Sequence, residues 1–506
     1  DAPGFEALVR DLDAFVAHIA EAHGIAVENI ALVAQSVGAV IAAAWVHDYA
    51  PRLRALVLAS PAFQVKLYVP LARPALRLGM RLRGNFFVNS YVKPQWLTHD
   101  EARIQSYRED PLITPQISVR VLLGLYATAR RVIADAEAIT VPLQMLVSGA
   151  DFVVHRGPQD RFYEGVSSAI RERVLLPGFY HDTLGEAGRE AALDKLRGFL
   201  VARFAEPFQA ASQREAHRRG PRFIESERLA WPPVAYSPQA LYWGGVRAGL
   251  KLRGLLSEGI ALGLRTGFDS GSTLDYIYRD QAQGLGPVGR CVDRNYLDAI
   301  GWRGIRVRGS HAEELLRLAA GRLREAGQPV HVLDIAAGHG RYVLNALAST
   351  TARADSILLR DFSELNVLRG REQIQARGAS DIARFERADA FDPASYRDLP
   401  VAPTLAIVSG LFELFSDNDQ VARALEALGQ ALAPGAWLVY TGQPWHPQLA
   451  FIARALTSHR GGMAWVMRRR STQEMDELVR AAGFAKLTQR IDPWGIFTVA
   501  LARRRG

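Results

Sequence analysis

Short apolar segments alternate with helical patterns in two separate series, and this alternation constrains the fold more than any other feature of the sequence. In the first series the strand candidates are residues 29–34, 56–59, 143–147 and 173–176. In the second series they lie near 331–335, 356–360, 382–387, 404–408, 435–441, 484–491 and 495–502. Strands that alternate with helices form parallel sheets with helices on both faces. The sequence therefore predicts an α/β chain with two doubly wound sheets.

A charged stretch that contains two adjacent prolines separates the two series. This stretch, residues 206–239, has a composition typical of a linker. We therefore predict a first α/β domain over residues 1–205. Beyond the linker, residues 240–325 have the pattern of helices that lead into a second α/β core over residues 326–506.

The composition excludes several classes of protein. The 506-residue chain has one cysteine, Cys291, which cannot form an intrachain disulfide, so we expect a reducing, cytoplasmic setting. No apolar run reaches the roughly 18 residues that a membrane span requires. The net charge of +9 comes mostly from dispersed arginines, without a nucleic-acid-binding or zinc-ligand pattern. We therefore expect a small-molecule or lipid-like substrate, no nucleic-acid partner and no metal, and no feature indicates an oligomeric state.

A serine stands between the first strand candidate and the helix that follows it. This serine, Ser36, lies in the sequence Ala34-Gln35-Ser36-Val37-Gly38. Small residues two positions before and after it allow a sharp turn that lifts the hydroxyl out of the sheet, and the N–H of Val37 then points toward a developing oxyanion. The turn is typical of a nucleophilic serine, although Ala34 stands where the usual pattern has glycine.

Two further residues can activate that serine. Asp151 follows the strand candidate 143–147, and His181 follows the candidate 173–176. A histidine takes the proton of a nucleophilic serine, and a carboxylate orients the histidine. Because the carboxyl ends of parallel strands meet at one edge of a sheet, we predict that Ser36, Asp151 and His181 form a catalytic triad in that chain order.

These residues resemble the α/β-hydrolase fold, and within it the monoacylglycerol lipase-like and serine aminopeptidase-like group, over about residues 1–204. The resemblance implies Ser36 as nucleophile, His181 as general base, Asp151 as its orienting carboxylate, and a helical cap at about 62–135. Hydrolases of this group have several strands and an oxyanion loop before the serine, whereas one helical pattern precedes Ser36 here. We therefore expect a partial hydrolase domain in an amino-terminally truncated chain.

Two roles stay open for this first domain. In one, it hydrolyses an acyl ester or a peptide. In the other, it is a catalytically silent module that presents a lipid-like substrate to the second domain. Within the expected cap, residues 67–83 are basic and amphipathic, a pattern that also indicates peripheral contact with an anionic membrane surface.

A glycine-rich loop opens the second α/β series. Its first strand candidate ends at Asp334, and Ala336, Gly338 and Gly340 follow before a helix begins. Glycines let the backbone approach a nucleotide-like ligand closely. A dinucleotide fingerprint needs a third small residue at the position of Val343, so nicotinamide-dependent oxidoreduction is the disfavoured alternative.

The spacing Asp-x-x-x-Gly-x-Gly in this loop resembles the first motif of class I methyltransferases that use S-adenosylmethionine. The next strand ends agree with that resemblance, which implies that one carboxylate accepts the ribose hydroxyls, that a second faces the adenine amino group, and that the fourth strand ends beneath the methyl position. The cofactor-binding residues implied at these strand ends are Asp361 and Phe362, Asp389 and Ala390, and Ser409.

This second resemblance covers about residues 240–506 and is greatest to a bacterial methyltransferase family that is often fused behind an α/β hydrolase. We therefore expect a bifunctional enzyme with a Rossmann-like methyltransferase domain and an amino-terminal serine hydrolase domain. The fourth strand end lacks an Asn/Asp-Pro-Pro-aromatic signature, which disfavours amino-group methylation of adenine, cytosine or glutamine and leaves an oxygen or another nitrogen acceptor open. Glu413 and His446 are candidates for removing a proton from the acceptor. The arginine runs 468–470 and 503–505 have the pattern of solvated surface.

Overall fold

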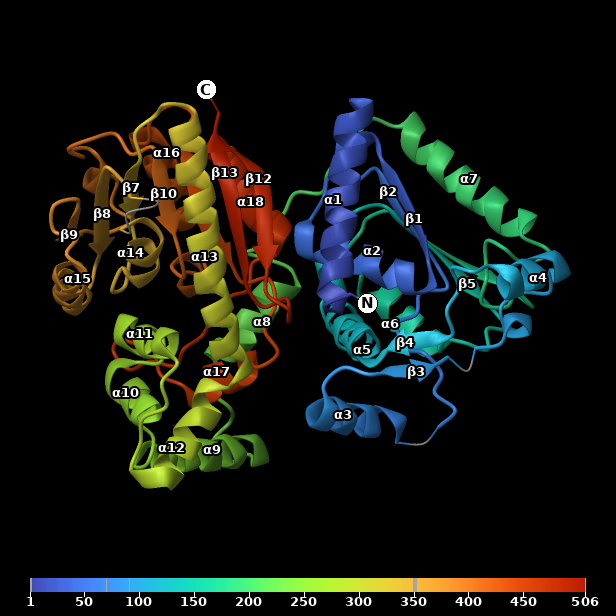
Figure 1. Ribbon diagram of the computed structural model, residues 1–506, viewed down its shortest axis with the longest axis horizontal. Coiled ribbons are helices and arrows are strands. Elements are labelled where there is room, and N and C mark those ends of the chain that lie inside the picture. The colour runs from blue at the N-terminus through green and yellow to red at the C-terminus, as the bar shows by residue number, and fades with distance from the viewer. Residues whose placement is uncertain (1, 70, 91, 349–352, 506) are drawn as a thin grey trace. The chain divides into compact units, whose positions relative to one another are not determined.

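The computed structural model describes residues 2–69, 71–90, 92–348 and 353–505. The chain divides into two compact units, Asp1–Ala211 and Ser212–Gly506 (Figure 1). Each unit has its own parallel or mostly parallel sheet with helices on both faces, so the predicted α/β fold class is confirmed. No helix of the described ranges is long and apolar enough to cross a membrane.

The sheet of the first unit has four parallel strands in the order β1-β2-β5-β6. These strands are β1 (Ala31–Gln35), β2 (Ala55–Ala59), β5 (Leu143–Ser148) and β6 (Arg171–Leu176). All residues of the two central strands, β2 and β5, are buried, as is usual for parallel strands covered on both faces. Each strand lies within two residues of its predicted position, because short apolar runs mark buried strands well.

Successive side chains of β2 enter different cores, so helices cover both faces of this sheet. Leu56 and Leu58 pack with α1, α2 and α5, whereas Val57 packs with α7 on the opposite face. The helices of this unit are α1 (Phe5–His23), α2 (Ser36–Tyr49), α3 (Ala72–Arg83), α4 (Glu101–Glu109), α5 (Val119–Ala134), α6 (Arg156–Gly165) and α7 (Glu190–Ala205). Short 3₁₀ helices occupy Val27–Asn29, Pro94–Trp96 and Ala136–Ala138.

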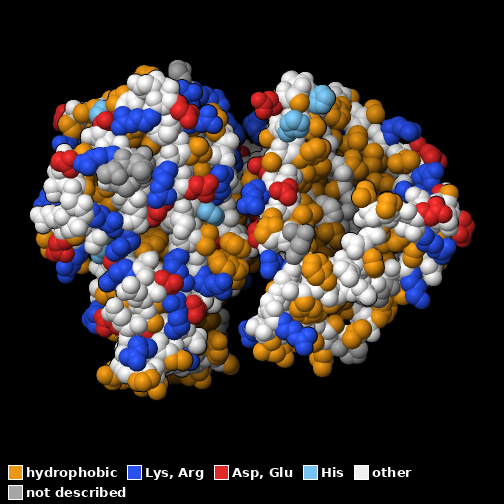
Figure 2. Space-filling model, in the orientation of Figure 1, with side chains coloured by type: hydrophobic (Ala, Val, Ile, Leu, Met, Phe, Trp, Pro, Cys, Tyr) orange, Lys and Arg blue, Asp and Glu red, His pale blue; other side chains and the backbone are white. Residues whose placement is uncertain are grey.

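The region between β2 and β5 differs in one respect from the helical cap expected at 62–135. Besides α3, α4 and α5 it contains a two-stranded antiparallel sheet of β3 (Phe87–Asn89) and β4 (Gln116–Ser118). Strands of three residues are too short to produce a recognisable alternation of side chains. Helix α3 has no buried residue, and Leu78 and Leu82 are more than half exposed. Figure 2 shows hydrophobic and basic side chains together over this helix.

The sheet of the second unit has seven strands in the order β12-β13-β11-β10-β7-β8-β9. Only β13 runs antiparallel to its neighbours, β11 and β12, in the described residues. The strands are β7 (His331–Asp334), β8 (Ser356–Asp361), β9 (Ala383–Arg387), β10 (Leu405–Val408), β11 (Trp437–Gly442), β12 (Phe484–Ile491) and β13 (Thr498–Arg504). The order reverses between β7 and β10, which is where open α/β sheets bind ligands.

Two helical layers bury this sheet. Val332 packs with α13 and α14 on one face, and Leu333 packs with α16 and α18 on the other. The other helices of this α/β core are α14 (Arg341–Leu347), α15 (Glu364–Ala376), α16 (Asn418–Ala431) and α18 (Thr472–Ala481), with 3₁₀ helices at Pro393–Tyr396 and Phe412–Leu414. Helix α17 (Leu449–Ala455) packs in a separate helical cluster.

Five further helices precede β7 and agree with the helical pattern expected over 240–325. They are α9 (Pro238–Gly254), α10 (Glu258–Thr266), α11 (Gly271–Arg279), α12 (Gly286–Leu297) and α13 (Ile300–Glu325). Their apolar side chains form a separate cluster with α17 and with the segment around Trp465. This cluster lies at the carboxyl end of the sheet (Figure 1), and several of its residues line a cavity there.

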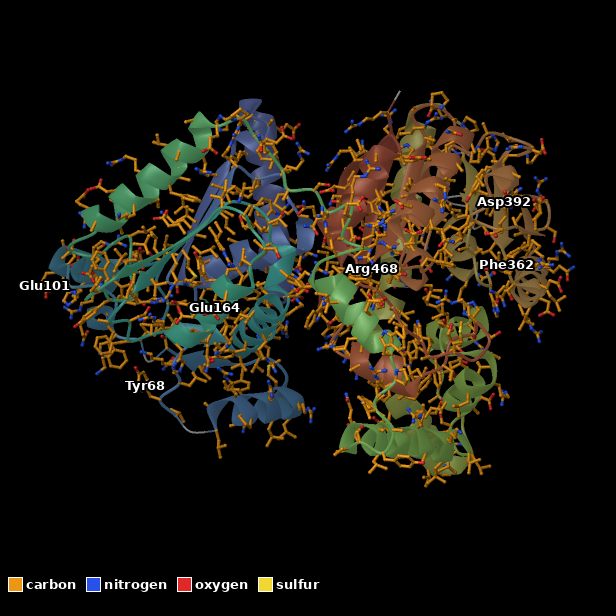
Figure 3. All side chains as sticks on the ribbon, turned by 180° about the vertical axis from the view of Figure 1, so that it is seen from behind. Tyr68, Glu101, Glu164, Phe362, Asp392 and Arg468 are labelled. Carbon is orange, nitrogen blue, oxygen red and sulfur yellow. The ribbon has the colours of Figure 1, made fainter. Side chains whose placement is uncertain are left out.

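The stretch 206–239 is more ordered than the linker that its composition predicts. It contains helix α8 (Pro221–Ala230), and Leu229 is buried in the helical cluster of the second unit. The arginines at 468–470 also differ from the expected solvated surface, because all three are buried (Figure 3). Arg468 forms an ion pair with buried Glu474, and Arg469 pairs with Glu225. The charge pattern misleads here because each guanidinium has polar partners that are distant in sequence.

Candidate active sites

Ser36 lies on the sharp turn between β1 and α2. Its φ angle is +55°, a left-handed conformation that is uncommon for a residue other than glycine. The residue begins α2, so its hydroxyl stands beyond the carboxyl end of β1. The N–H of Val37 lies in the first turn of that helix, where backbone N–H groups have no intrahelical acceptor.

Three polar side chains meet at this turn. Ser36 Oγ lies 2.7 Å from His181 Nε2, and His181 Nδ1 lies 2.7 Å from Asp151 Oδ2. The other carboxylate oxygen of Asp151 accepts the N–H groups of Val153 and Val154 at 2.7 and 2.9 Å. The side chains of His181 and Asp151 are 6% and 8% exposed. An ionised Asp151 therefore holds the proton of His181 on Nδ1 and leaves Nε2 as the acceptor for the serine hydroxyl.

The loop that carries His181 is fixed by two neighbouring polar side chains. Gln35 donates to Asp182 Oδ1 at 2.8 Å and accepts the N–H of Leu184 at 3.0 Å. Glu186 accepts the N–H groups of Tyr180 and His99. Burial raises the pKa of Glu186, but these backbone hydrogen bonds outweigh it and lower the pKa overall. The loop position of His181 is thus set by the amide of Gln35 and the carboxylate of Glu186.

The glycine loop of the second unit follows β7. Gly338 and Gly340 have φ angles of +59° and +74°, and a Cβ at Gly340 would come within 2.4 Å of Leu359. The N–H of Gly338 donates to Asp361 Oδ2 at 2.9 Å. Asp361 Oδ1 accepts the N–H of Ser363 at 2.9 Å and the side-chain amide of Asn366 at 3.0 Å. Three of about four acceptor positions on this carboxylate are used, and one stays available.

Asp334 lies behind this loop rather than in the opening. Its side chain is fully buried, accepts the hydroxyl of Tyr342 at 2.7 Å and accepts the N–H of Ala336 at 3.2 Å. Burial raises the pKa of Asp334 to about 7, although the hydrogen bonds to Tyr342 and Ala336 favour its ionised form. The carboxylate of Asp334 thus fixes the backbone of the glycine loop at Ala336.

The other predicted cofactor residues lie at two separate places. Ala336, Gly338 and Ser409 line one small cavity of about 40 Å³. Phe362 and Asp389 are exposed at the ends of β8 and β9, and the guanidinium of Arg387 lies 5.3 Å from the ring of Phe362 (Figure 3). Ala390 is buried, and its carbonyl accepts the hydroxyl of Tyr396.

Several residues around the small cavity have no signal in the sequence. They come from α11, α13, the start of α14 and the glycine loop itself, and they are Gly271, Asp275, Tyr278, Arg308, Arg341 and His339. Arg341 donates to Asp275 at 2.7 Å, which ties α14 to α11. Gly271 lies 3.9 Å from the point where a Cβ on Gly338 would be, so the start of α11 covers the glycine loop.

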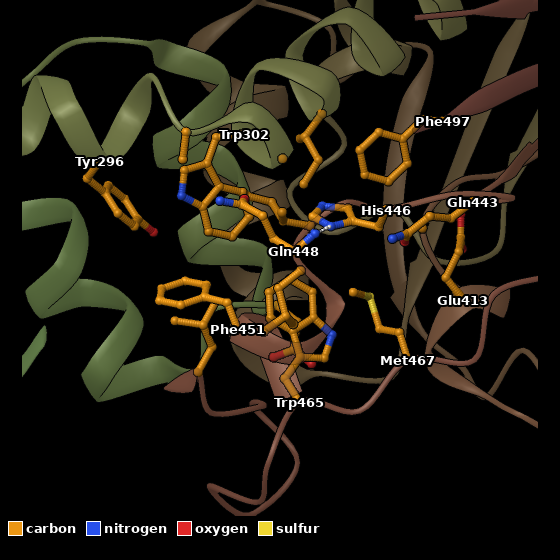
Figure 4. A pocket seen from close by; sticks show the side chains of 18 of the residues that line it. Tyr296, Trp302, Glu413, Gln443, His446, Gln448, Phe451, Trp465, Met467 and Phe497 are labelled. Atoms are coloured by element: carbon orange, nitrogen blue, oxygen red, sulfur yellow. Dashed lines mark hydrogen bonds between the residues drawn. The ribbon is translucent and has the colours of Figure 1, made fainter. Parts of the chain in front are cut away.

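A second, larger cavity of about 390 Å³ adjoins the first (Figure 4). Leu274 and Arg308 line both. The walls of the larger cavity are mostly apolar and aromatic, and include Tyr296, Trp302, Phe451, Trp465, Met467 and Phe497. A cavity of this size and character is typical of a small-molecule site.

Polar atoms without hydrogen-bond partners belong to this apolar wall. They include Glu413 Oε2, Gln443 Nε2, Trp465 Nε1, Tyr296 Oη and Arg308 Nε. The other oxygen of Glu413 accepts the hydroxyl of Thr441 at 3.1 Å. Buried polar groups in proteins nearly always have partners. Several orphaned atoms around one cavity therefore indicate a ligand that supplies the partners.

The structure argues against His446 as a base. Its Nδ1 accepts the N–H of Gln448 at 3.0 Å, so the neutral ring carries its proton on Nε2. Burial, together with the charge of Arg469, lowers the pKa of His446 to about 3. His446 is therefore a neutral hydrogen-bond donor in the cavity wall. Of the two proton acceptors that the sequence suggests, Glu413 is the one whose geometry is suitable.

One group of potential metal ligands lies outside both sites. His217, Asp417 and Asp419 bring ligand atoms within 4.8 Å of one another. The guanidinium of Arg218 already forms an ion pair with Asp419, and both aspartates are about half exposed. A cation is therefore already present at this cluster in the form of an arginine.

The fold and these two sites define a serine hydrolase-like domain followed by a class I methyltransferase-like domain. Residues 1–188 match the family model described as "Serine aminopeptidase, S33", and residues 196–504 match the one described as "Putative methyltransferase". The second match spans more than half of the chain, so the protein belongs to this methyltransferase family, with an S33-type hydrolase domain at its amino-terminal end.

Curated proteins and solved structures are similar to the whole chain or to part of it. The chain is 54% identical over 503 residues to the uncharacterized protein YnbC of Escherichia coli K12, covering 99% of this chain and 86% of that one. It is 26% identical over 171 residues to the phospholipase YtpA of Bacillus subtilis, covering 33% of this chain and 66% of that one. The solved monoacylglycerol lipase of Paleococcus ferrophilus is 19% identical, with 40% of this chain and 76% of that one covered and a TM-score of 0.36.

Proposed function

We propose that the second unit transfers a methyl group from S-adenosylmethionine to a small molecule bound in the 390 Å³ cavity. The observation that carries this proposal is the adjacency of two openings. The glycine loop and Ser409 line a small cavity, a large apolar cavity adjoins it, and Leu274 and Arg308 belong to both walls. A donor in the first opening and an acceptor in the second would therefore meet at Arg308.

The residues of the glycine loop fit this cofactor. Gly338 keeps side-chain atoms out of the space beside the loop, and Gly340 lets the loop lie close against Leu359. Asp361 retains acceptor capacity for a ribose hydroxyl. We assign Asp389, with Phe362 and Ala390 beside it, to the adenine end, and Asp334 to the support of the loop. When bound, S-adenosylmethionine supplies an electrophilic methyl group, and the contribution of this chain is to position the acceptor oxygen or nitrogen in line with it.

Cofactor binding tests this half of the proposal. We expect the purified chain to bind S-adenosylmethionine in calorimetry and to incorporate isotopic methyl label, and we expect Asp361→Ala to lose binding. Glu372→Ala is a suitable control, because Glu372 is an exposed acid on the helix after Asp361 that pairs with Arg369. Binding of NAD without binding of S-adenosylmethionine would instead support the oxidoreductase alternative.

We further propose that the first unit is a serine hydrolase, so that the protein is bifunctional. In this mechanism His181 Nε2 takes the proton of Ser36, the serine oxygen attacks the carbonyl carbon of the substrate, and the Val37 N–H stabilises the resulting oxyanion. Asp151 keeps the histidine in the required tautomer. The likeness of this unit to a phospholipase supports an acyl ester as the substrate.

The alternative for this unit is a silent module that holds a substrate for the methyltransferase. The two 2.7 Å contacts of His181 and the left-handed conformation of Ser36 favour an active site, since neither is needed for binding alone. Labelling with a fluorophosphonate distinguishes the two roles. We expect the parent chain to be labelled and Ser36→Ala to be unlabelled; a parent chain that neither reacts nor cleaves short acyl esters would favour the silent module.

A further inference from the structure

We propose that the methyl acceptor is a largely apolar molecule with one acidic hydroxyl, such as a phenol or enol, whose oxyanion pairs with Arg308. This inference rests on the methyltransferase function proposed above and names its substrate class. It follows from the wall of the large cavity, from the environment of Arg308 and from the position of Glu413.

The cavity fits a mostly apolar body. Trp302 and Trp465 form part of its wall with nearly parallel rings, 6.1 Å apart and inclined by 19°. Phe451 and Met467 add further apolar surface, and Figure 4 shows these four side chains facing the same space. Pockets of about 300–1,000 Å³ with such walls bury most of a small-molecule ligand. A highly charged acceptor would lose its hydration in this cavity without gaining enough polar contacts to compensate.

Arg308 lies in this apolar setting without a direct ion pair. It is 5% exposed, its Nε has no hydrogen-bond partner, and it makes a long contact of 3.5 Å with the hydroxyl of Tyr278. Burial lowers the pKa of Arg308 and the charge of Glu413 helps to raise it overall, but no carboxylate in the described ranges forms an ion pair with this guanidinium. A buried guanidinium without a directly paired counter-ion is costly, so a ligand that brings one negative charge is favoured.

The position of Arg308 connects this charge to the proposed reaction. The residue lines both cavities, and a Cβ on Gly410 would come within 3.2–3.3 Å of its guanidinium nitrogens. Gly410 follows Ser409 at the end of β10 and has a φ angle of +76°. The glycine thus leaves room for the guanidinium at the junction where the acceptor oxygen has to lie.

The carboxylate of Glu413 indicates which functional group of the acceptor receives the methyl group: an acidic hydroxyl, a carboxylic acid or an amine. Its Oε2 has no partner and belongs to the same wall, so it is suited to accept a proton or a hydrogen bond. A carboxylic acid would arrive already ionised and would be repelled by this carboxylate. An aliphatic amine would arrive protonated and would be repelled by Arg308, and an aromatic amine would arrive neutral and bring no negative charge to pair with Arg308. A hydroxyl of low pKa satisfies both residues, because it first donates its proton to Glu413 and then pairs with Arg308.

The proposed step conserves atoms and charge. The O–H bond of the acceptor breaks, and its proton passes to Glu413 Oε2. The oxygen lone pair forms the new bond to the methyl carbon, and the electron pair of the broken carbon–sulfur bond stays on sulfur. Arg308 stabilises the oxyanion before attack, and Glu413 returns its proton to solvent after the methylated product leaves.

Four naphthalene probes with the same body test the substrate class in the full-length protein. They carry a hydroxyl, an amine, a carboxylate or a methoxy group at position 2. We expect 2-naphthol to bind about tenfold or more tightly than 2-methoxynaphthalene, to be the one that is methylated, and to show the absorption band of its anion when bound at neutral pH. Equal binding of the four probes, preference for the amine or carboxylate, or no binding of 2-naphthol would overturn the proposal.

Two variants assign this preference to residues. Arg308→Met should remove the preference for 2-naphthol and its anion band, whereas Arg303→Met, on the same helix but against the ring of Trp494, should retain both. Glu413→Gln keeps the hydrogen-bond geometry with Thr441 and should lower the methylation rate and shift its pH profile while S-adenosylmethionine still binds. An unchanged anion band in Arg308→Met would contradict the inference. Failure of the parent chain to bind S-adenosylmethionine would instead contradict the proposed function.

Discussion

Replacing Asp151 by asparagine reverses the protonation of His181 in a way that the hydrogen bonds of this site dictate. One oxygen of Asp151 faces two backbone N–H groups, those of Val153 and Val154, which can only donate. The carbonyl oxygen of an asparagine has to face these donors, so its NH₂ group has to face His181 Nδ1. An NH₂ group cannot accept a proton, and His181 therefore moves its own proton to Nε2, opposite the hydroxyl of Ser36.

With a proton on Nε2, His181 can no longer take the proton of the serine. A neutral triad with this tautomer loses about 10⁴-fold in rate, which corresponds to about 5 kcal/mol of transition-state stabilisation. We expect Asp151→Asn to react with a fluorophosphonate and to cleave p-nitrophenyl esters about 10⁴-fold more slowly than the parent, with an unchanged circular dichroism spectrum.

The control is Asp160→Asn, which alters a carboxylate of the same unit that pairs with Arg156 and Arg173. This variant should keep the parental rate. A rate for Asp151→Asn within about tenfold of the parent would refute the argument from the tautomer, because one factor of ten is only about 1.4 kcal/mol. A parent chain that fails to react at all would refute the hydrolase proposal itself.

Three further predictions concern stability and surface binding. The pKa of Asp334 is about 7 when folded, above its ordinary value of 3.8, so the free energy of unfolding falls as pH rises through this range. Between pH 5 and pH 8 the expected fall is on the order of 3 kcal/mol. Asp334→Asn should remove this fall in urea unfolding at the two pH values, and parallel curves for both chains would contradict it. Glu474→Gln leaves buried Arg468 without its counter-charge and should cost about 3–5 kcal/mol in urea unfolding, whereas the exposed pair of Glu372 should contribute less than about 1 kcal/mol. If α3 contacts an anionic membrane, the chain should co-sediment with phosphatidylglycerol vesicles and Leu82→Asp should weaken this roughly tenfold or more, an effect absent with neutral vesicles.

The strands and most helices of both units follow from local patterns in the sequence. Buried parallel strands are short apolar runs, and most runs of this chain end in, or are followed within two residues by, glycine, serine or aspartate, which suit the turns. The small sheet of β3 and β4 could not be predicted, because its strands pair across α4 and contain three residues each. Arg468–Arg470 show the same limit for charge, since their burial depends on Glu474, Glu225 and the carbonyls of Phe412 and Phe415.

The positions of Ser36, Asp151 and His181 relative to one another could be predicted because each follows a parallel strand, and parallel strands bring their carboxyl ends together. The same reasoning brings Gly338 beside Asp361. This rule about strand ends does not predict the positions of Asp275 and Tyr278, because they belong to a helix and approach the glycine loop through tertiary packing. It also does not reveal the protonation of His446, which depends on a backbone N–H two residues later in a tight turn.

The large cavity could not be predicted for a more general reason. Apolar side chains on helices α9–α13 have the same spacing whether they fill a core or line a space, so the sequence cannot distinguish a packed cluster from a hollow one. Small residues in these helices decide which it is: a Cβ on Gly259 would come within 2.7 Å of the rings of Tyr276 and Tyr296, so this glycine lets Tyr296 take its place in the cavity wall. About half of the residues that line the cavity therefore belong to the region of helices α9–α13, outside the α/β layers, whereas the glycine loop and Asp361 belong to the sheet edge. Substitutions of cavity-lining residues on α9, α10 and α12 should then change which acceptor is methylated without changing the affinity for S-adenosylmethionine. At Leu274 and Arg308, which border both cavities, the two effects cannot be separated.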